Sequence, residues 1–433
     1  MSASLSERQQ DDLHKAILDY LSSAGFEHTF VEFKKEANLA DFQPDLGQKS
    51  NGLLVKKWTS VIRMQKKILD LETRLQEALH DNATAAVLPA GFSRRNNPDW
   101  LPTASSSRHT LTGHRDAVNA VAFHPVYSAL VSASDDATLK VWDWETGELE
   151  RTLKGHTKRV TDCEFDSKGK SLVSASYDLF IKLWNVENDY QNFATLRGHE
   201  HSVSSARFLP GDDRIVSSSR DQSVRIWEIA TTHCVKVIRP HSDWVRCAIP
   251  SLDGKYVVTC SMDHTAHVVE INSGTTKAEL RGHDNVVEAA VFVPKASVPA
   301  LRELTGQKGP AITDTISVAH VVTASRDKTI KIWDAIRGQC LHTLVGHDDW
   351  VRALVFHPNG KYLLSSSDDH TIRIWELKTG RCIRKIEAHE RFVACLAWGR
   401  QALSSAGDGN EGPTLMNVIA SGSSDQTVKV WIP

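Results

Sequence analysis

The sequence predicts an all-β protein, a seven-bladed β-propeller that is preceded by an α-helical segment and a short coiled coil. Two observations predict the ring. Stretches such as VNAVAF, ALVSAS and TLKVWD alternate apolar and polar residues as strands do. A histidine recurs in steps of 42, 43, 42, 42, 64 and 42 residues, at His114, His156, His199, His241, His283, His347 and His389. Four short strands in a repeat of this length are typical of a propeller blade.

Other residues recur in step with the histidines. An Asp follows each His, 22 residues later in five repeats, 44 in the fifth and 36 in the seventh. Ser or Thr stands four residues before this Asp and Trp six after it, except that the fourth repeat has Val269. With the Gly-His and Trp-Asp pairs, residues 108–433 resemble the WD40 family. The resemblance implies that His, Asp, Ser/Thr and Trp form one hydrogen-bonded set per blade, and buried Asp and His do need partners.

The ends of the repeat region predict how the ring closes. The chain stops at VKVWIP, after the third strand of the seventh repeat, and RHTLTGH (108–114) supplies one strand before the first His. We expect this strand to complete the last blade and so to remove exposed sheet edges. The fifth and seventh repeats carry 22 and 14 extra residues. Their Gly, Pro and Ser predict surface loops opposite the His–Asp turns, either tolerated insertions or functional ones.

Residues 8–40 predict two short amphipathic helices. About 30 residues cannot bury an apolar face alone, so the face needs a partner surface. The arrangement is similar to the LisH motif, which implies homodimerisation; packing against the ring is the alternative. The apolar positions that carry the resemblance are Ile17, Tyr20, Leu21, Phe26 and Phe33.

Residues 54–80 predict a short parallel coiled coil that would extend the dimer. Its seam alternates in steps of three and four, and the positions that we expect to contact a second copy include Val61, Ile68, Leu71 and Leu75. Residues 81–107 are polar and contain Pro and Ser, which predicts a flexible linker. The expected molecule is two rings on one stalk.

The composition argues against several functions. The 51 Lys and Arg nearly balance the 53 Asp and Glu, so no overall charge favours nucleic acid or an anionic membrane. The polar start shows no signal peptide, and no stretch approaches the roughly 18 apolar residues that span a bilayer. Seven Cys without a Cys-x-x-Cys favour a reducing compartment. We expect a soluble intracellular protein with no metal, no cofactor and no membrane insertion.

Two repeats share an unusual stretch, HSDWVRC at 241–247 and HDDWVRA at 347–353. The Val is expected to point inward, so the Trp and Arg beside it should lie at one face of the ring. Trp and Arg dominate protein interfaces, and an exposed Trp needs a reason. With the residues before the repeat aspartates, this face is expected to carry Arg220, Trp244, Arg246, Arg326, Trp350 and Arg352, with Phe392 next to them. We call the first six residues the Arg–Trp face.

The Arg–Trp face predicts a binding surface for an acidic, folded protein. The alternative is that each Arg is a solvated charge and each Trp packs between blades, as is common for single residues. Nucleic acid is not expected, because Asp135 and Glu288 would interrupt any continuous basic track.

The order of LisH motif, coiled coil and seven WD40 blades resembles the lissencephaly (nuclear distribution) family of cytoplasmic dynein regulators over the whole chain. SRDKTIKIWD (325–334), TLVGHDDWVRALVFH (343–357) and SDQTVKVW (424–431) are close to what the family carries. The resemblance implies a non-catalytic homodimer that binds the dynein heavy-chain motor domain and acts with a NudE-type coiled-coil protein. Its roles would be microtubule minus-end transport, nuclear migration and mitotic spindle positioning. Its location would be the cytoplasm and cytoskeleton, at microtubule plus ends and spindle poles.

The same resemblance implies which side chains contact the motor, namely Arg220, Arg246, Arg326 and Trp350. His370 stands where animal members are expected to carry Lys, which leaves the charge of that contact open.

Two other classes of protein stay open. One is a WD40 substrate receptor of a ubiquitin ligase, although such receptors often carry Trp-Asp-x-Arg where this chain reads WDWE from 142 and WDAI from 333. The other is an enzyme. The repeated His, Asp and Ser are distributed alike over seven repeats, as a scaffold would be, and no Gly-rich phosphate loop is present. We therefore expect no catalytic residues.

Overall fold

The computed structural model describes residues 13–37 except 16, 19, 23 and 25, together with 99–103, 107–306, 318–403 and 414–433. The chain divides into two compact units, Met1–Pro89 and Ala90–Pro433. The predicted coiled coil, with Val61, Ile68, Leu71 and Leu75, lies outside the described residues, as does most of the predicted linker.

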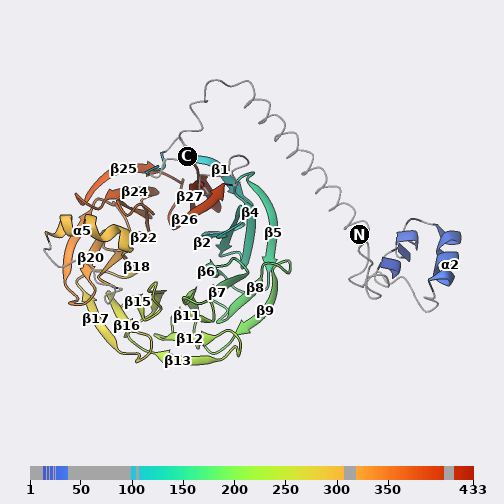
Figure 1. Cartoon of the computed structure of the whole chain (residues 1–433), viewed down its shortest axis with the longest axis horizontal. Helices are drawn as coiled ribbons and strands as arrows, with labels where there is room; N and C mark the ends of the chain where they lie inside the picture. The colour runs from blue at the N-terminus through green and yellow to red at the C-terminus, as the bar shows by residue number, and fades with distance from the viewer. Residues whose placement is uncertain are drawn as a thin grey trace, which may run out of the picture. The chain divides into compact units, whose positions relative to one another are not determined.

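The described part of the second unit forms seven four-stranded antiparallel sheets, which are the blades of a propeller (Figure 1). Blades one to three are β2 (Val118–Phe123), β3 (Ala129–Ser134), β4 (Thr138–Asp143), β5 (Glu148–Lys154); β6 (Val160–Phe165), β7 (Ser171–Ser176), β8 (Ile181–Asn185), β9 (Gln191–Leu196); and β10 (Val203–Phe208), β11 (Arg214–Ser219), β12 (Val224–Glu228), β13 (Cys234–Ile238). Blades four to six are β14 (Val245–Pro250), β15 (Tyr256–Ser261), β16 (Thr265–Glu270), β17 (Thr276–Arg281); β18 (Val287–Phe292), β19 (His320–Ser325), β20 (Thr329–Asp334), β21 (Cys340–Val345); and β22 (Val351–Phe356), β23 (Tyr362–Ser367), β24 (Thr371–Glu376), β25 (Arg381–Glu387). The predicted seven-bladed propeller is confirmed.

Blade seven closes the ring, as the sequence predicted. It joins β26 (Val393–Leu403), β27 (Thr414–Ser423) and β28 (Thr427–Trp431) to β1 (Ser107–Thr112) from the start of the repeat region. Leu111 pairs with Val428 and Thr110 with Lys429, and Figure 1 shows the C-terminus beside β1. Hydrogen bonds between the first and the last strand therefore hold the propeller shut.

The apolar core lies between neighbouring blades. Trp184 of blade two belongs to one buried cluster with Val131 and Val141 of blade one. Trp375 of blade six shares a cluster with Val322 and Ile332 of blade five. Each blade therefore buries its face only against its neighbours, and the closed ring is the unit that has a complete core.

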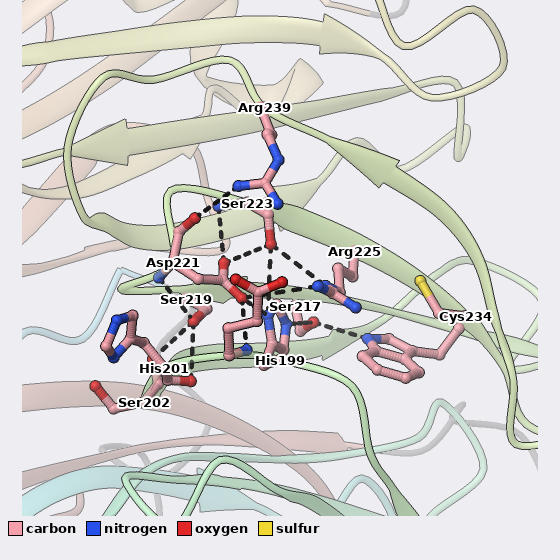
Figure 2. Close-up of polar contacts among 12 residues, drawn as sticks. His199, His201, Ser202, Ser217, Ser219, Asp221, Ser223, Arg225, Cys234 and Arg239 are labelled. Carbon is pink, nitrogen blue, oxygen red and sulfur yellow. Dashed lines mark hydrogen bonds and ion pairs between the residues drawn. The ribbon is translucent and has the colours of Figure 1, made fainter.

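A polar network ties the strands of each blade together, as the WD40 resemblance implied. In blade three, His199 Nδ1 lies 2.8 Å from Asp221 Oδ2, its Nε2 lies 2.7 Å from Ser217 Oγ, and Trp227 Nε1 donates to the same Ser217 oxygen over 2.8 Å (Figure 2). The His–Asp distances in the seven blades are 2.6–2.9 Å and the His–Ser/Thr distances 2.7–2.9 Å. These residues are structural.

Two blades depart from the full network. Blade four has Val269 in place of Trp, and the ring of His267 lies 4.2 Å from that of His241 instead. In blade seven the buried Trp431 Nε1 has no hydrogen-bond partner among the described residues. The expected Trp bond is therefore made in five blades, while the His–Asp bond is made in all seven.

The two insertions are more regular than the loops that we expected. In blade five, η2 (Lys295–Ser297) leads into α5 (Val298–Thr305), whose Leu301 is fully buried against Leu344 and its neighbours. In blade seven, the extra residues lengthen β26 and β27 into a longer ladder that reaches Leu403 and Thr414. The prediction of plain loops was wrong for these parts. In blade five, the Gly, Pro and Ser content of the insertion concealed the apolar residues of α5 that are buried, Val298 and Leu301. Residues 307–317 and 404–413 lie outside the described part.

Part of the segment predicted as a flexible linker packs on blades six and seven. Trp100 lies edge-on to Trp398 with 6.3 Å between ring centroids, and Asp99 pairs with Lys361 at 3.0 Å. Arg384 donates to the carbonyl oxygen of Pro102 over 2.7 Å. Residues 99–103 are thus held by aromatic, ionic and backbone contacts, which the polar composition of 81–107 did not indicate.

The first unit contains the predicted helices. The described residues among 13–22 are helical, and α2 covers Glu27–Glu36. Leu18 is fully buried, and the predicted contact residues Ile17, Leu21 and Phe33 are half-buried. Four apolar side chains are 39–53 % exposed, namely Leu13, Tyr20, Phe26 and Val31. Within the described residues, no helix is long and apolar enough to cross a membrane.

Candidate protein-binding face

Both tryptophans of the Arg–Trp face are held by an aspartate that precedes them. The backbone N–H of Trp244 donates to Asp243 Oδ1 over 2.7 Å, and that of Trp350 donates to Asp349 Oδ1 over 2.9 Å. Their carbonyl oxygens accept the backbone N–H of the residue before the repeat aspartate, each over 2.9 Å. The same local contacts recur in blades four and six. In each blade they hold the Trp at the start of the innermost strand.

Arginines stack on these indoles across blade boundaries. The Cζ atom of Arg220, from blade three, lies 3.4 Å from the ring of Trp244 in blade four. Arg326 of blade five lies over Trp350 of blade six at 4.2 Å, and Arg352 lies 4.9 Å from the same ring. Such cation–π contacts contribute about 0.5–1 kcal/mol each at exposed sites, and they orient the guanidinium over the ring. The stacks join blade three to blade four and blade five to blade six.

Three arginines also converge on Glu288 of β18. Arg246 Nη2 lies 2.6 Å from Glu288 Oε2, Arg326 Nε donates to Oε1, and Arg352 Nη1 lies 3.4 Å from Oε1. The Glu288 side chain is only 3 % exposed, whereas those of the arginines are 19–25 % exposed. Burial alone would raise the pKa of Glu288, but the three positive charges outweigh burial and lower its pKa to about 2. Glu288 is therefore ionised at physiological pH.

A second carboxylate completes the cluster. Asp368 accepts hydrogen bonds from Arg352 Nε over 2.8 Å and Nη2 over 2.7 Å, a two-pronged geometry that fixes the plane of the guanidinium. The cluster lies at the mouth of the central channel, a cavity of about 530 Å³. Beside Arg220 and Trp244 there is a smaller hollow of about 340 Å³. In the described part of the chain, no group of three or more His, Cys, Asp or Glu is placed to hold a metal ion.

The structure brings together all six residues of the predicted Arg–Trp face. The alternative that each Arg is a solvated charge is wrong for Arg246, Arg326 and Arg352, which are ion-paired. Glu288, which was expected to interrupt a basic track, is buried and ion-paired with the arginines. Phe392 is 47 % exposed, and its ring lies 5.9 Å from that of His370.

Sequence reasoning missed the two carboxylates that hold the arginines, Glu288 and Asp368. The sequence does contain a pattern that indicates the pairing of Glu288 with arginines. Glu288 occupies the fifth position after its repeat His, as Arg246 and Arg352 do in the adjacent blades. Opposite charges at one position of neighbouring innermost strands indicate a pair.

Models of known protein families match both units of the chain. Residues 7–42 match the model of the PAC1 LisH domain. The model of the WD domain, G-beta repeat, matches seven times, at 105–143, 147–185, 190–228, 232–269, 274–334, 338–376 and 380–431.

The similar proteins carry one kind of name. The nuclear distribution protein nudF of Aspergillus niger is 45 % identical over 448 residues, with all of both chains covered. The nuclear distribution protein PAC1 of Coccidioides posadasii is 43 % identical over 381 residues, covering 84 % of this chain and 79 % of the relative. PAC1 of Arthroderma benhamiae is 46 % identical over 383 residues, covering 84 % and 82 %.

The LisH and WD40 resemblances are thereby confirmed, and they identify a non-catalytic regulator. With 43–46 % identity over most or all of the chain, this protein belongs to the nuclear distribution protein family that includes PAC1 and nudF.

Proposed function

We propose that this protein is a homodimeric regulator that binds the motor domain of the cytoplasmic dynein heavy chain through the Arg–Trp face. It acts with a NudE-type coiled-coil protein in nuclear migration, microtubule minus-end transport and mitotic spindle positioning. It works in the cytoplasm on the cytoskeleton, at microtubule plus ends and spindle poles. The relatives named nuclear distribution proteins support the nuclear migration role.

The observation that carries the proposal is one continuous surface of oriented arginines and indoles over blades three to six. Each guanidinium has five N–H donors, and Glu288 and Asp368 occupy only some of those on Arg246, Arg326 and Arg352. The remaining donors can bind carboxylates of an acidic partner, while the indoles supply flat apolar area. Arg and Trp are the residue types in which binding energy concentrates at protein interfaces.

Exposed apolar side chains support the homodimer. Leu13, Tyr20, Phe26 and Val31 in the first unit leave 39–53 % of their area exposed in the single chain. A unit this small gains stability when such side chains are covered by a second copy.

The direct test is co-sedimentation of the full chain with a purified dynein motor domain. The wild type is compared with a variant in which Arg220, Arg246, Arg326 and Trp350 are all Ala, and melting temperature reports whether each is folded. We expect the four changes to weaken binding about a hundredfold or more, because they remove the stacked and ion-paired anchors together.

A matched control changes three exposed cations at the end of the first connection of blades two to four or at the start of the strand that follows, at the opposite ends of the strands: Lys170, Arg214 and Lys255. This variant should bind as the wild type does. Equal binding by the four-residue variant would contradict the proposed face. A folded wild type that does not bind the motor would contradict the dynein assignment and favour the ubiquitin-ligase alternative.

A further inference from the structure

One buried carboxylate joins three neighbouring blades at the mouth of the channel. Glu288 Oε2 accepts from Arg246 of blade four through Nε at 2.9 Å and Nη2 at 2.6 Å. Its other oxygen accepts from Arg326 of blade five and faces Arg352 of blade six. With 3 % of its side chain exposed, Glu288 offers a partner protein almost no surface of its own.

The charges of the cluster do not cancel. Arg246, Arg326 and Arg352 bring three positive charges, while Glu288 and Asp368 bring two negative ones. The cluster keeps a net positive charge whose positions are set by side chains that a partner cannot reach. An arginine side chain has about 2 kcal/mol of rotamer entropy, so holding it in advance lowers the cost of binding.

We propose that Glu288 is the positioning residue of the Arg–Trp face. It holds the guanidiniums of Arg246 and Arg326, and with Asp368 that of Arg352, so that their free N–H groups meet carboxylates on an acidic partner surface. The inference rests on the proposed function that this face binds the dynein motor domain. Glu288 thereby acts through the arginines and does not itself contact the partner.

Charge and positioning make opposite predictions for Glu288→Gln. The change removes one negative charge from a face that binds an acidic surface, so attraction alone would tighten binding. If Glu288 acts by positioning, the loss of the central carboxylate releases three guanidiniums and binding becomes weaker. The sign of the change therefore separates the two roles.

The experiment measures the Kd of the full-length protein for the purified dynein motor domain. We expect Glu288→Gln to raise the Kd about tenfold or more, as when one partner of a buried charged pair is removed. Glu288→Asp keeps the charge but shortens the side chain by one methylene, so it should also weaken binding. The melting temperature of each variant reports whether it is folded. If Glu288→Gln does not fold, the Kd of Glu288→Asp tests the proposal in its place.

Asp162→Asn is the matched control. Asp162 is another buried channel carboxylate and is bonded to Arg207 at 2.7 Å, away from the Arg–Trp face. It should leave the Kd within about twofold of the wild type. A loss equal to that of Glu288→Gln would mean a general effect on the channel and would overturn the proposal.

A double change tests whether Glu288 acts through an arginine. Combined with Arg246→Ala, Glu288→Gln should weaken binding by less than the product of the two separate factors, because the residues act as a unit. Unchanged or tighter binding by Glu288→Gln, with binding still lost in the four-residue variant, would overturn the positioning role and leave the proposed function standing. A wild type that does not bind would remove the proposed function itself.

Discussion

At the scale of residues, a buried His–Asp pair ties the strands of each blade together. Burial would raise the pKa of Asp221, but its interactions with His199, Ser223 and the backbone N–H of Glu200 together outweigh burial and lower that pKa. Burial lowers the pKa values of His199 and His347, and it lowers that of His267 to about 4. The folded state therefore keeps the repeat aspartates charged and these histidines neutral.

We predict that acid weakens the fold in two stages. The histidine pKa values lie below the ordinary 6.5, so the unfolded chain binds protons first and stability falls as the pH drops below about 6.5. Each such histidine contributes up to about 1.4 kcal/mol per pH unit. The aspartate pKa values lie below 3.8, so a further loss begins under that pH. Urea unfolding followed by Trp fluorescence at several pH values measures both stages.

His267→Gln should flatten the first stage between about pH 6.5 and 4, because His267 is buried beside His241. The exposed His201 provides the control, and His201→Gln should leave the slope unchanged. Stability that is constant from pH 7.5 to 5 would contradict the neutral state of the buried histidines.

At the scale of elements, strand β1 decides whether the ring is closed. It comes from the start of the repeat region and pairs with β28 at the end of the chain, and its Leu111 is 2 % exposed within the cluster that includes Val428. Strand β28 has β27 on its other side, so β1 is the strand that completes blade seven. Blades one and seven also pack together in the same buried cluster, so the hydrogen bonds of β1 and this apolar packing close the ring together.

Leu111→Ala should lower the free energy of unfolding by about 2–5 kcal/mol, the usual cost of a cavity in a packed core. Chemical denaturation measures the change. Thr110→Ala, at an exposed position of the same strand, should alter stability by no more than about 0.5 kcal/mol. If Leu111→Ala lowered the free energy of unfolding no more than Thr110→Ala does, the packing of β1 would not contribute to closure.

At the scale of the whole molecule, the proposed dimer would present two Arg–Trp faces to one partner. Two linked sites bind more tightly than one when their spacing allows both to engage. The described residues that would be covered by a second copy, such as Tyr20 and Phe26, belong to the first unit. Dimerisation and motor binding are therefore separable by mutation.

We predict that light scattering of the full chain gives twice the 48.1 kDa of one copy. Tyr20→Asp with Phe26→Asp should yield a monomer, because charged side chains cannot be buried unpaired between two copies. Ser22→Asp adds charge at an exposed polar position of the same unit and should stay dimeric. A wild-type monomer, or a double variant that stays dimeric, would contradict the proposed interface.

The sequence by itself determined the repeat, the blade count, the His–Asp pairs, the closing strand and the residues of the Arg–Trp face. These follow from local periodicity, because each blade repeats one pattern of strands and turns. Only the tertiary structure decided that Glu288 lies among three arginines, that α5 packs on the ring and that Trp100 contacts blades six and seven. The reason is physical: these contacts join different blades, or join an insertion or a polar segment to the ring, so no spacing within one repeat records them.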